Sequence, residues 1–489
     1  MTTAQIEQRA VSATFWSGAE TIGRQGLQFV ITMVLARLLT PEDYGTVALL
    51  AIFLGLAGVL INSGFSSALI QRQGVTAVDL SSVWLFNVVM ALVAAAVLCA
   101  AAGGIAAFYG KPVLRPLTWL LSADLVIGAL GAVHRVQLIK SLDFRRLCLI
   151  SVVALVVSGG LAIVLAYRGY GAWTLGWQAL AFSAVSTGLL WVVSPWRVGR
   201  EFSLESVRSL FRFGSFLLMS SVLDVLYSRL NTLVIGKFYS AKDLGYYARA
   251  DNTSQIPGSL MSGVLSSVAF PVFARVQQDR ALLRSGLRKA VLLAMLVNIP
   301  AMLGMIVAAR PLVVVLFGEQ WVPCVPYLQI LCLAGLFWPL HTLNLNVLVA
   351  QGHSQRFFRL EVAKKTVSLA LLGVACFFGV TAIAWSAVVA GAICYVINAY
   401  YSGQLLGYGA GAQLRDLLPY VGVGAAMALA VAGLAWVLPG WPWLQLTGQV
   451  VAGGLVYAGL CALLRLPAWA EAWSLAKTSP LGRRFVGNA

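Results

Sequence analysis

Seven ionisable side chains lie inside long apolar stretches of this sequence, where they could bind a charged ligand or pair with one another. Three are arginines and four are acids: Arg24, Arg229, Arg249, Glu20, Asp124, Asp224 and Asp251. A charged side chain at the centre of a bilayer costs about 3 kcal/mol on insertion scales, so seven that faced lipid would cost about 20 kcal/mol together. We therefore expect these side chains to face a wet cavity or one another.

Two pairs of these charges lie close together along the chain. Glu20 and Arg24 are four residues apart and share one helix face, which permits an ion pair. Arg24 lies thirteen residues before Arg37, or about 20 Å along a helix, which places it within the hydrocarbon. Asp224 and Arg229 lie about 140° apart around a helix, so they cannot neutralise each other on one face. Each charge could line a cavity or only neutralise a neighbour, and both interpretations stay open.

Other polar groups interrupt the apolar stretches. Residues 246–259 form a polar run that contains Pro257, which removes an intrahelical hydrogen bond, followed by Gly258. We predict a helix break at these two residues, within a helix that lines the cavity. A short interfacial segment ahead of a shorter span is the alternative. His341 and Asn344 could either hydrogen-bond to a neighbouring helix or take part in ion coupling.

The amino-acid composition indicates that these groups lie in a membrane protein. Of the 489 residues, 60% are hydrophobic and 10% are charged, and the mean hydropathy is +0.85, whereas soluble domains carry about 25% charged residues. This composition excludes a water-soluble fold. Apolar stretches long enough to cross about 30 Å of hydrocarbon recur along the chain. We predict an all-α polytopic membrane protein with about fourteen transmembrane helices, at 13–37, 44–70, 81–107, 113–134, 147–167, 172–193, 213–236, 243–274, 290–309, 323–350, 357–378, 381–403, 417–437 and 445–464.

The positions of the basic residues predict the orientation in the membrane. The chain carries 34 Lys and Arg and a net charge of +17. If the N-terminus is cytoplasmic, 24 of these basic residues fall on the cytoplasmic side, seven on the other side and three inside spans. This positive-inside distribution predicts that both termini are cytoplasmic. The excess of basic over acidic residues indicates contact with anionic membrane lipids, and we expect no nucleic-acid partner.

One short motif occurs twice. The segment LARLLTPEDYG at 35–45 aligns with IGKFYSAKDLG at 235–245, at a constant offset of 200 residues. Each copy joins the first two spans of one half, so we predict two six-helix lobes related by pseudo-twofold symmetry and followed by two further helices. The expected bounds are 1–200 for the N-terminal lobe, 201–403 for the C-terminal lobe, and 404–489 for the two additional helices and a cytoplasmic tail.

The repeated motif also predicts two helix starts. Thr40 and Ser240 are placed as N-caps, and Asp43 and Asp243, three residues later, can complete capping boxes. Pro41 suits the first helical position. The alternative is that both copies are only tight turns.

The sequence contains no recognisable catalytic constellation. It has no nucleotide-binding glycine loop with a lysine, no acidic pair in a soluble loop, and no metal-ligand spacing among its seven cysteines and three histidines. We expect no enzyme activity, no catalytic or metal-binding residue, and no cofactor apart from a coupling ion, H⁺ or Na⁺.

Three segments carry a resemblance to a known family. FWSGAETIGRQG at 15–26, LARLLTPEDYG at 35–45 and GFSSALIQ at 64–71 resemble the polysaccharide transporter branch of the multidrug/oligosaccharidyl-lipid/polysaccharide exporter superfamily, and in particular its flippases of exopolysaccharide and lipopolysaccharide synthesis, of the colanic-acid type. The resemblance implies a V-shaped pair of lobes in a bacterial inner membrane. It also implies that the cargo is an undecaprenyl-diphosphate-linked oligosaccharide, moved from the cytoplasmic to the periplasmic leaflet by alternating access. A polysaccharide polymerase and chain-length or export machinery are the implied protein partners.

The resemblance suggests roles for the seven ionisable residues inside the predicted spans. Arginine offers a planar fork of donors to phosphate oxygens, so Arg24, Arg229 and Arg249 are the candidates to bind a diphosphate. The acids Glu20, Asp124, Asp224 and Asp251 could bind a coupling ion or balance the arginines. A multidrug/cation antiporter and a peptidoglycan-precursor flippase of the same superfamily remain alternatives. A membrane glycan polymerase or ligase is a weaker alternative. Such enzymes usually present a large periplasmic loop, whereas the predicted periplasmic connections of this chain are all short.

Overall fold

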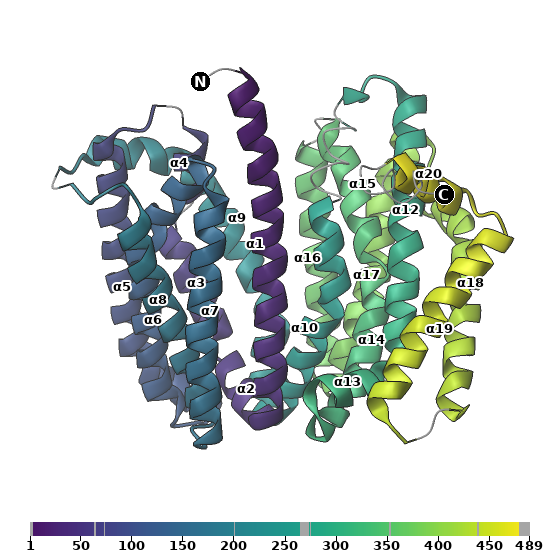
Figure 1. Ribbon diagram of the computed structural model, residues 1–489, viewed down its shortest axis with the longest axis horizontal. Coiled ribbons are helices and arrows are strands. Elements are labelled where there is room, and N and C mark those ends of the chain that lie inside the picture. The colour runs from purple at the N-terminus through teal and green to yellow at the C-terminus, as the bar shows by residue number, and fades with distance from the viewer. Residues whose placement is uncertain are drawn as a thin grey trace. The chain divides into compact units, whose positions relative to one another are not determined.

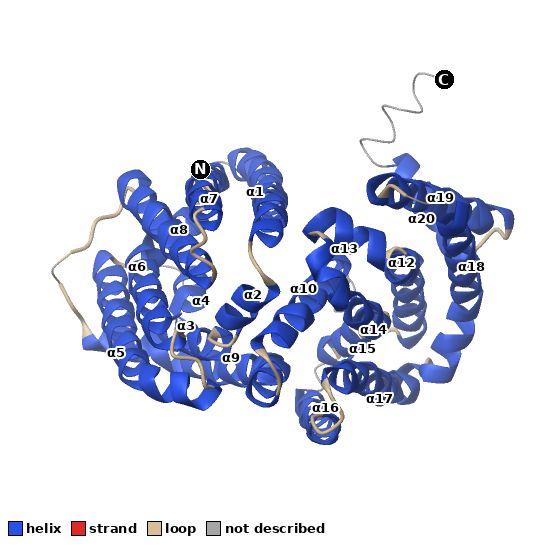
Figure 2. Cartoon of the chain, turned by 90° about the horizontal axis from the view of Figure 1, so that it is seen from below, coloured by secondary structure: helices blue, strands red, loops and turns tan. Residues whose placement is uncertain are grey.

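The described part of the protein is built from helices. The computed structural model describes residues 3–62, 65–72, 74–199, 201–264, 273, 275–351, 354–437 and 440–478, and these residues contain no strand. Figure 2 shows only helices and the loops that join them. The chain divides into two compact units, Met1–Gly245 and Tyr246–Ala489, which we call the first and the second unit. The predicted all-α class is confirmed.

The first unit is a group of long helices joined by short connections (Figure 1). Within it, α1 packs against α7, α8 packs against α6 and α7, and α5 packs against α6. The last full helix, α9, packs against α3, α4 and α5. The helices are α1 (Thr3–Leu38), α2 (Pro41–Ala48), α3 (Ala51–Asn62), α4 (Phe65–Gln71), α5 (Ala77–Tyr109), α6 (Leu114–Lys140), α7 (Phe144–Tyr167), α8 (Ala172–Val193) and α9 (Leu204–Phe238), followed by the first turn of α10 (Ala241–Val264).

The second unit contains the rest of α10 and the remaining helices. Its centre is α12, which packs against α14, α15 and α18. A cluster of buried apolar side chains joins α12 to α15, α17 and α18. The elements are α12 (Arg280–Val307), α13 (Ala309–Phe317), the 3₁₀ helix η2 (Glu319–Cys324), α14 (Val325–Gly335), α15 (Trp338–Ala350), α16 (Ser354–Ala375), α17 (Val380–Leu406), α18 (Ala410–Val437), α19 (Pro442–Leu463) and α20 (Pro467–Thr478).

The structure contains a helix at each predicted span, although these helices differ in how apolar they are. Among the described residues, ten helices are long and apolar enough to cross a membrane, and the pair α2 and α3, bent by 41°, would form an eleventh span. The other three predicted spans are the helices α1, α10 and α16. Each of these three carries charged side chains within its length. The membrane-spanning class is confirmed, and the exact number of fourteen spans stays a prediction.

The boundary between the two compact units differs from the predicted lobe boundary. The first unit ends at Gly245, whereas the repeat predicts a boundary near residue 200. The reason is that α9 packs against helices of the first unit. The two additional helices, α18 and α19, pack with α12 and α13 in the second unit. The division by repeats into 1–200, 201–403 and 404–489 stays a prediction.

Both copies of the repeated motif form the predicted capping box. The Thr40 backbone N–H donates to Asp43 Oδ2 at 2.9 Å, and the Asp43 N–H donates to Thr40 Oγ1 at 3.3 Å. In the second copy, the Ser240 N–H donates to Asp243 Oδ2 at 3.4 Å, and the Asp243 N–H donates to Ser240 Oγ at 3.0 Å. Each box satisfies backbone donors that the first turn of a helix leaves without partners. The two segments therefore start α2 and α10 in the same way.

The glycine that ends each copy of the motif lies against the backbone of the other copy. A Cβ added to Gly45 would lie 1.6 Å from the Ala241 carbonyl oxygen, and one added to Gly245 would lie 1.9 Å from the Pro41 carbonyl oxygen. Only a residue without a side chain allows two helix backbones to approach so closely. The start of α2 and the first turn of α10 therefore cross through this reciprocal pair, which we call the glycine crossing.

We expect Gly45→Ala and Gly245→Ala each to destabilise the protein by about 3 kcal/mol, because backbone atoms must move to admit the methyl group. Thermal unfolding of the purified protein in detergent measures this change. The matched control is Gly104→Ala in α5, where an added Cβ would meet no atom within 4 Å. Alanine is favoured over glycine inside a helix by about 0.5–1 kcal/mol, so this control should unfold no earlier than the wild type. Unchanged unfolding temperatures for both crossing variants would contradict the close approach.

Candidate functional site

A cluster of charges forms around Glu20 in the first unit. Its carboxylate lies 3.4 Å from Arg24 Nε on the same helix, α1, and 3.9 Å from Arg135 Nη2 on α6. The Ser151 hydroxyl on α7 donates to Glu20 Oε1 at 3.4 Å. The predicted ion pair between Glu20 and Arg24 is therefore confirmed. We call these four residues the Glu20 cluster.

The Glu20 cluster carries more positive than negative charge. The Glu20 side chain is 12% exposed, whereas the side chains of Arg24 and Arg135 are 43% and 47% exposed. One largely buried carboxylate thus lies within ion-pair distance of two guanidinium groups whose side chains remain partly accessible. Each guanidinium has five N–H donors in a fixed fork, and a single carboxylate cannot occupy all of them. The remaining donors can bind an anion with several oxygens, such as a phosphate.

Arg135 was missed as a site residue in the sequence. The predicted span at 113–134 ends one residue before Arg135, so the prediction leaves Arg135 outside the membrane helices. In the structure α6 continues to Lys140, so Arg135 projects from a helix and not from a loop. The only signal in the sequence was its position directly beyond an apolar stretch, and nothing in its spacing pointed to Glu20.

Asp124 lies on α6 but outside the Glu20 cluster. It precedes Arg135 by eleven residues, which is about 17 Å along a helix. The Ser183 hydroxyl on α8 hydrogen-bonds to its side chain. Its Oδ1 atom is buried and has no hydrogen-bond partner among the described residues. Asp124 is thus held between α6 and α8, and its predicted role in coupling or charge balance stays a prediction.

Asp224 and Arg229 lie on α9, and both side chains are exposed. The helix packs against α3 through the neighbouring residue, because an added Cβ on Gly55 would lie 3.0 Å from Val225 Cγ1. Arg229 therefore has the accessibility that a substrate-binding role requires. The predicted ligand contact of Arg229 and the predicted charge-balancing role of Asp224 stay predictions.

Arg249 is placed differently from the other two predicted arginines. It lies in the second unit and is 7% exposed. Its guanidinium carbon lies 4.8 Å from the ring centroid of Phe317 and 5.0 Å from that of Trp321. Desolvated contacts between a cation and aromatic faces stabilise a fold. Arg249 therefore joins α10 to α13 and η2, and its predicted contact with substrate stays a prediction.

Pro257 and Gly258 lie inside α10, which is a continuous helix from Ala241 to Val264, and the predicted bend at these residues stays a prediction. Membrane helices tolerate proline where neighbouring groups satisfy the freed backbone atoms. Polar side chains in the preceding turn bond within the helix: the Thr253 hydroxyl donates to the Arg249 carbonyl at 2.8 Å, and the Gln255 amide donates to Asp251 Oδ2 at 2.9 Å. The polar run is thus accommodated inside a continuous helix.

His341 and Asn344 on α15 bond to neighbouring helices. His341 Nδ1 lies 3.1 Å from the Asn398 side-chain amide on α17. The Asn344 and Gln413 amides exchange two hydrogen bonds, at 2.9 Å and 3.1 Å, between α15 and α18. These contacts favour the packing interpretation over an ion-coupling role.

The second unit also contains an apolar cavity of about 450 Å³. Side chains from α12, α15 and α18 line it, including Met295, Ile299, Leu340, Leu414 and Leu418. A lining without polar side chains suits an aliphatic ligand, because no hydrogen-bonding group of a polar ligand would be satisfied there.

The structure predicts that two of the arginines differ in their effect on stability. We expect Arg249→Ala to destabilise the protein by about 2 kcal/mol, because it removes a desolvated cation from two aromatic rings. The exposed Arg229→Ala should change the unfolding free energy by less than about 0.5 kcal/mol. Thermal unfolding in detergent compares the two variants, and equal midpoints would contradict the structural role of Arg249.

Comparison with curated proteins finds relatives named for surface-polysaccharide synthesis. The lipopolysaccharide biosynthesis protein WzxC of Escherichia coli is 29% identical over 361 residues, which cover 73% of each chain. The teichuronic acid biosynthesis protein TuaB of Bacillus subtilis is 24% identical and covers 88% of this chain and 90% of its own. The succinoglycan biosynthesis transport protein ExoT of Rhizobium meliloti is 28% identical and covers 67% of this chain and 66% of its own.

Solved structures show the same fold at low sequence identity. The lipid II flippase MurJ, in an inward closed conformation, superposes with a TM-score of 0.73 at 15% identity, covering 92% of this chain and 98% of its own. A multidrug resistance MATE family transporter superposes with a TM-score of 0.61 at 17% identity, covering 78% of this chain and 94% of its own. Residues 34–326, more than half of the chain, match the family described as "Polysaccharide biosynthesis protein". The resemblance seen in the sequence motifs is confirmed, and this chain belongs to the polysaccharide biosynthesis protein family.

Proposed function

We propose that this protein is a flippase that moves lipid-linked oligosaccharide units from the cytoplasmic to the periplasmic leaflet, for exopolysaccharide or lipopolysaccharide synthesis. The observation that carries the proposal is the Glu20 cluster, which presents two accessible guanidinium groups on membrane helices. The family and the names of the relatives support a cargo on the route to surface polysaccharide. The fold shared with a lipid II flippase supports transport of a lipid-linked sugar.

The Glu20 cluster suits the head group of such a cargo. An undecaprenyl-diphosphate carries several anionic oxygens, and the forks of Arg24 and Arg135 can each donate two hydrogen bonds to them. Without cargo, Glu20 neutralises part of this positive charge. With cargo, the phosphate oxygens would compete with the carboxylate for the same donors. Binding would therefore exchange one anion for another, so that the arginines are never left without a counter-charge.

The lipid tail of the cargo calls for a different surface. A polyprenyl chain has no hydrogen-bonding group, so it is best accommodated by apolar side chains. The apolar cavity of the second unit has such a lining.

Coupling to a proton or sodium gradient is part of the proposal, with Glu20, Asp124, Asp224 and Asp251 as the acids that could bind the ion. We place the protein in a bacterial inner membrane with both termini in the cytoplasm, in agreement with the excess of basic residues on that side. A polysaccharide polymerase and export machinery would take up the flipped units. We expect no enzyme activity. A rate of translocation that ignores both gradients would favour facilitated diffusion.

A multidrug/cation antiporter is the second candidate, because a transporter of that kind shares the fold. A surplus of positive charge in the Glu20 cluster argues against a cationic cargo. Resistance to cationic dyes on expression of this protein would favour the antiporter. Rescue of a strain that lacks its lipid II flippase would instead favour a peptidoglycan precursor as cargo.

We expect Arg24→Ala and Arg135→Ala each to lower the export of surface polysaccharide by about tenfold or more, because each removes charge-assisted hydrogen bonds to the head group. Arg24→Lys should be intermediate, since lysine keeps the charge without the fork. Export per cell is measured together with the abundance of the protein in the membrane.

The matched control is Arg146→Ala. Arg146 lies at the start of α7, pairs with Asp143 at 3.2 Å, and has a side chain that is 54% exposed. Its removal should leave export unchanged. Full export by both Arg24→Ala and Arg135→Ala at normal abundance would overturn the assignment of the Glu20 cluster to the head group.

A further inference from the structure

A tryptophan lies one helical turn from the Glu20 cluster. Trp16, Glu20 and Arg24 follow one another at intervals of four residues, so they share one face of α1. Trp16 is therefore about 6 Å along the helix from Glu20, toward the N-terminus. It is partly exposed, and the guanidinium carbon of Arg145 on α7 lies 5.7 Å from the centroid of its ring. We call Trp16 and Arg145 the Trp16 pair.

Arg145 keeps its hydrogen-bond donors available to a ligand. The residue is exposed, and among the described residues it forms no ion pair, whereas its neighbour Arg146 pairs with Asp143. An aromatic face attracts a cation but takes up few of its hydrogen bonds. The five N–H donors of the Arg145 guanidinium can therefore bind hydroxyl or anionic oxygens.

The proposed cargo carries a sugar close to this pair. In an undecaprenyl-diphosphate-linked oligosaccharide, the first sugar is joined directly to the diphosphate, and the centre of its ring lies about 4 Å from the nearer phosphorus at bond lengths of about 1.5 Å. A diphosphate held by Arg24 and Arg135 therefore brings the first sugar within about one helical turn of the Glu20 cluster. The Trp16 pair lies at that distance.

The order of groups along α1 determines the side on which the sugar lies. Leu27, Ile31 and Leu35 follow Arg24 and belong to an apolar cluster shared with α7. Trp16 lies on the other side of Arg24, where the sequence is more polar. A polyprenyl chain is stabilised at the apolar end and a sugar at the polar end. The sugar of a bound cargo therefore extends from the diphosphate toward Trp16.

An indole ring beside an arginine suits a sugar. One face of a pyranose ring carries C–H groups and is apolar, whereas its edge carries hydroxyl groups. Packing the C–H face on an indole ring removes apolar surface of both from water. Arginine N–H groups can at the same time donate to the hydroxyl oxygens. The Trp16 pair therefore offers both contacts that a sugar ring needs.

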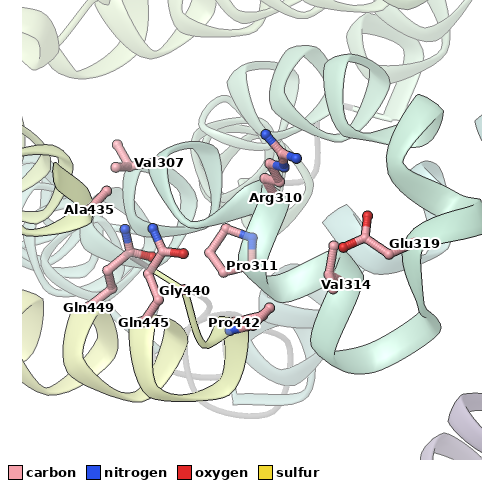
Figure 3. A pocket seen from close by; sticks show the side chains of 10 residues that line it. All are labelled: Val307, Arg310, Pro311, Val314, Glu319, Ala435, Gly440, Pro442, Gln445 and Gln449. Atoms are coloured by element: carbon pink, nitrogen blue, oxygen red, sulfur yellow. The ribbon is translucent and has the colours of Figure 1, made fainter. Parts of the chain in front are cut away.

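The second unit contains a polar pocket that is less suited to a sugar ring. Its volume of about 370 Å³ is within the range of small-ligand sites. Figure 3 shows Arg310 and Pro311 between Gln449 and Glu319, so the polar groups are spread along the pocket. The lining residues described for it include no aromatic side chain. The pocket therefore lacks a surface on which the C–H face of a sugar can stack.

We propose that the Trp16 pair binds the first sugar of the lipid-linked cargo. The C–H face of the sugar packs on the indole ring of Trp16, and Arg145 donates to its hydroxyl oxygens. This inference rests on the proposed function, because the Glu20 cluster must hold the diphosphate for the sugar to reach the pair. The Glu20 cluster binds the diphosphate that every carrier lipid has, whereas the Trp16 pair distinguishes a carrier loaded with sugar from an empty one.

The test compares carrier lipids with and without a sugar. The purified full chain in detergent is titrated with undecaprenyl diphosphate, undecaprenyl-diphosphate-glucose and undecaprenyl-diphosphate-N-acetylglucosamine, and native mass spectrometry gives the dissociation constants. We expect at least one sugar-carrying lipid to bind about tenfold more tightly than undecaprenyl diphosphate, because the sugar adds apolar contact and hydrogen bonds. Equal affinity for all three lipids would overturn the proposal.

Two variants address the pair itself. Trp16→Leu should remove the preference for the sugar-carrying lipid and leave the affinity for undecaprenyl diphosphate within about twofold. Arg145→Gln is an exposed substitution that should fold even if Trp16→Leu does not, and it should reduce the preference about threefold. If Trp16→Leu weakens all three lipids alike, Trp16 only packs helices and the proposal fails. A preference that both variants retain has the same meaning.

Arg24→Ala separates this inference from the proposed function. It should weaken all three lipids by the same factor and leave the preference intact. The absolute affinity thus tests the Glu20 cluster, and the ratio of affinities tests the Trp16 pair. Unchanged affinity of both Arg24→Ala and Arg135→Ala for undecaprenyl diphosphate would overturn the head-group site and this inference with it.

The matched control is Trp119→Leu on α6. Trp119 is 45% exposed, and the guanidinium carbon of Arg115 lies 5.3 Å from its ring centroid. It is 16 residues from Arg135, or about 24 Å along the helix. This control should keep the preference, and its loss would show that the preference does not come from the Trp16 pair. Gln445→Ala should keep it too, whereas a loss there would place the sugar in the polar pocket of the second unit and overturn the proposal.

Discussion

A charged group among membrane helices needs a counter-charge, a hydrogen bond, an aromatic face or water, because hydrocarbon provides none of these. The protein meets this requirement in more than one way. Glu20 lies between two arginines that remain accessible, whereas Arg249 is enclosed by the rings of Phe317 and Trp321. The first arrangement keeps donors available for a ligand, and the second stabilises the packing of helices. The same constraint thus separates a site that can bind an anion from a contact that supports the fold.

The glycine crossing gives the repeated motif a structural meaning that its alignment alone lacked. The two capping boxes start α2 and α10 with equivalent hydrogen bonds, and Gly45 and Gly245 then let these starts touch. A contact in which each copy meets the same atoms of the other is what a pseudo-twofold relation between repeats produces. The motif is therefore both a local turn and half of a tertiary contact.

Features that depend on residues close together in the sequence could be predicted. Features that depend on contacts between different helices could not. The capping boxes and the pairing of Glu20 with Arg24 follow from spacings of three and four residues, and both are present. Arg135 was missed because its partner lies on another helix. Pro257 lies within the continuous helix α10, which is possible because the cost of a proline in a membrane depends on the groups packed around it. The aromatic rings beside Arg249 are equally a product of tertiary packing.

The proposed cargo of this protein is a lipid-linked oligosaccharide, carried across the membrane in which the protein resides. The most direct measurement deletes its gene and follows polyprenyl-diphosphate-linked oligosaccharides by mass spectrometry, together with their accessibility from each face of the membrane. We expect these lipids to accumulate on the cytoplasmic leaflet while surface polysaccharide is lost, and the wild-type gene to reverse both changes. Unchanged lipid pools with normal surface polysaccharide would contradict this proposal.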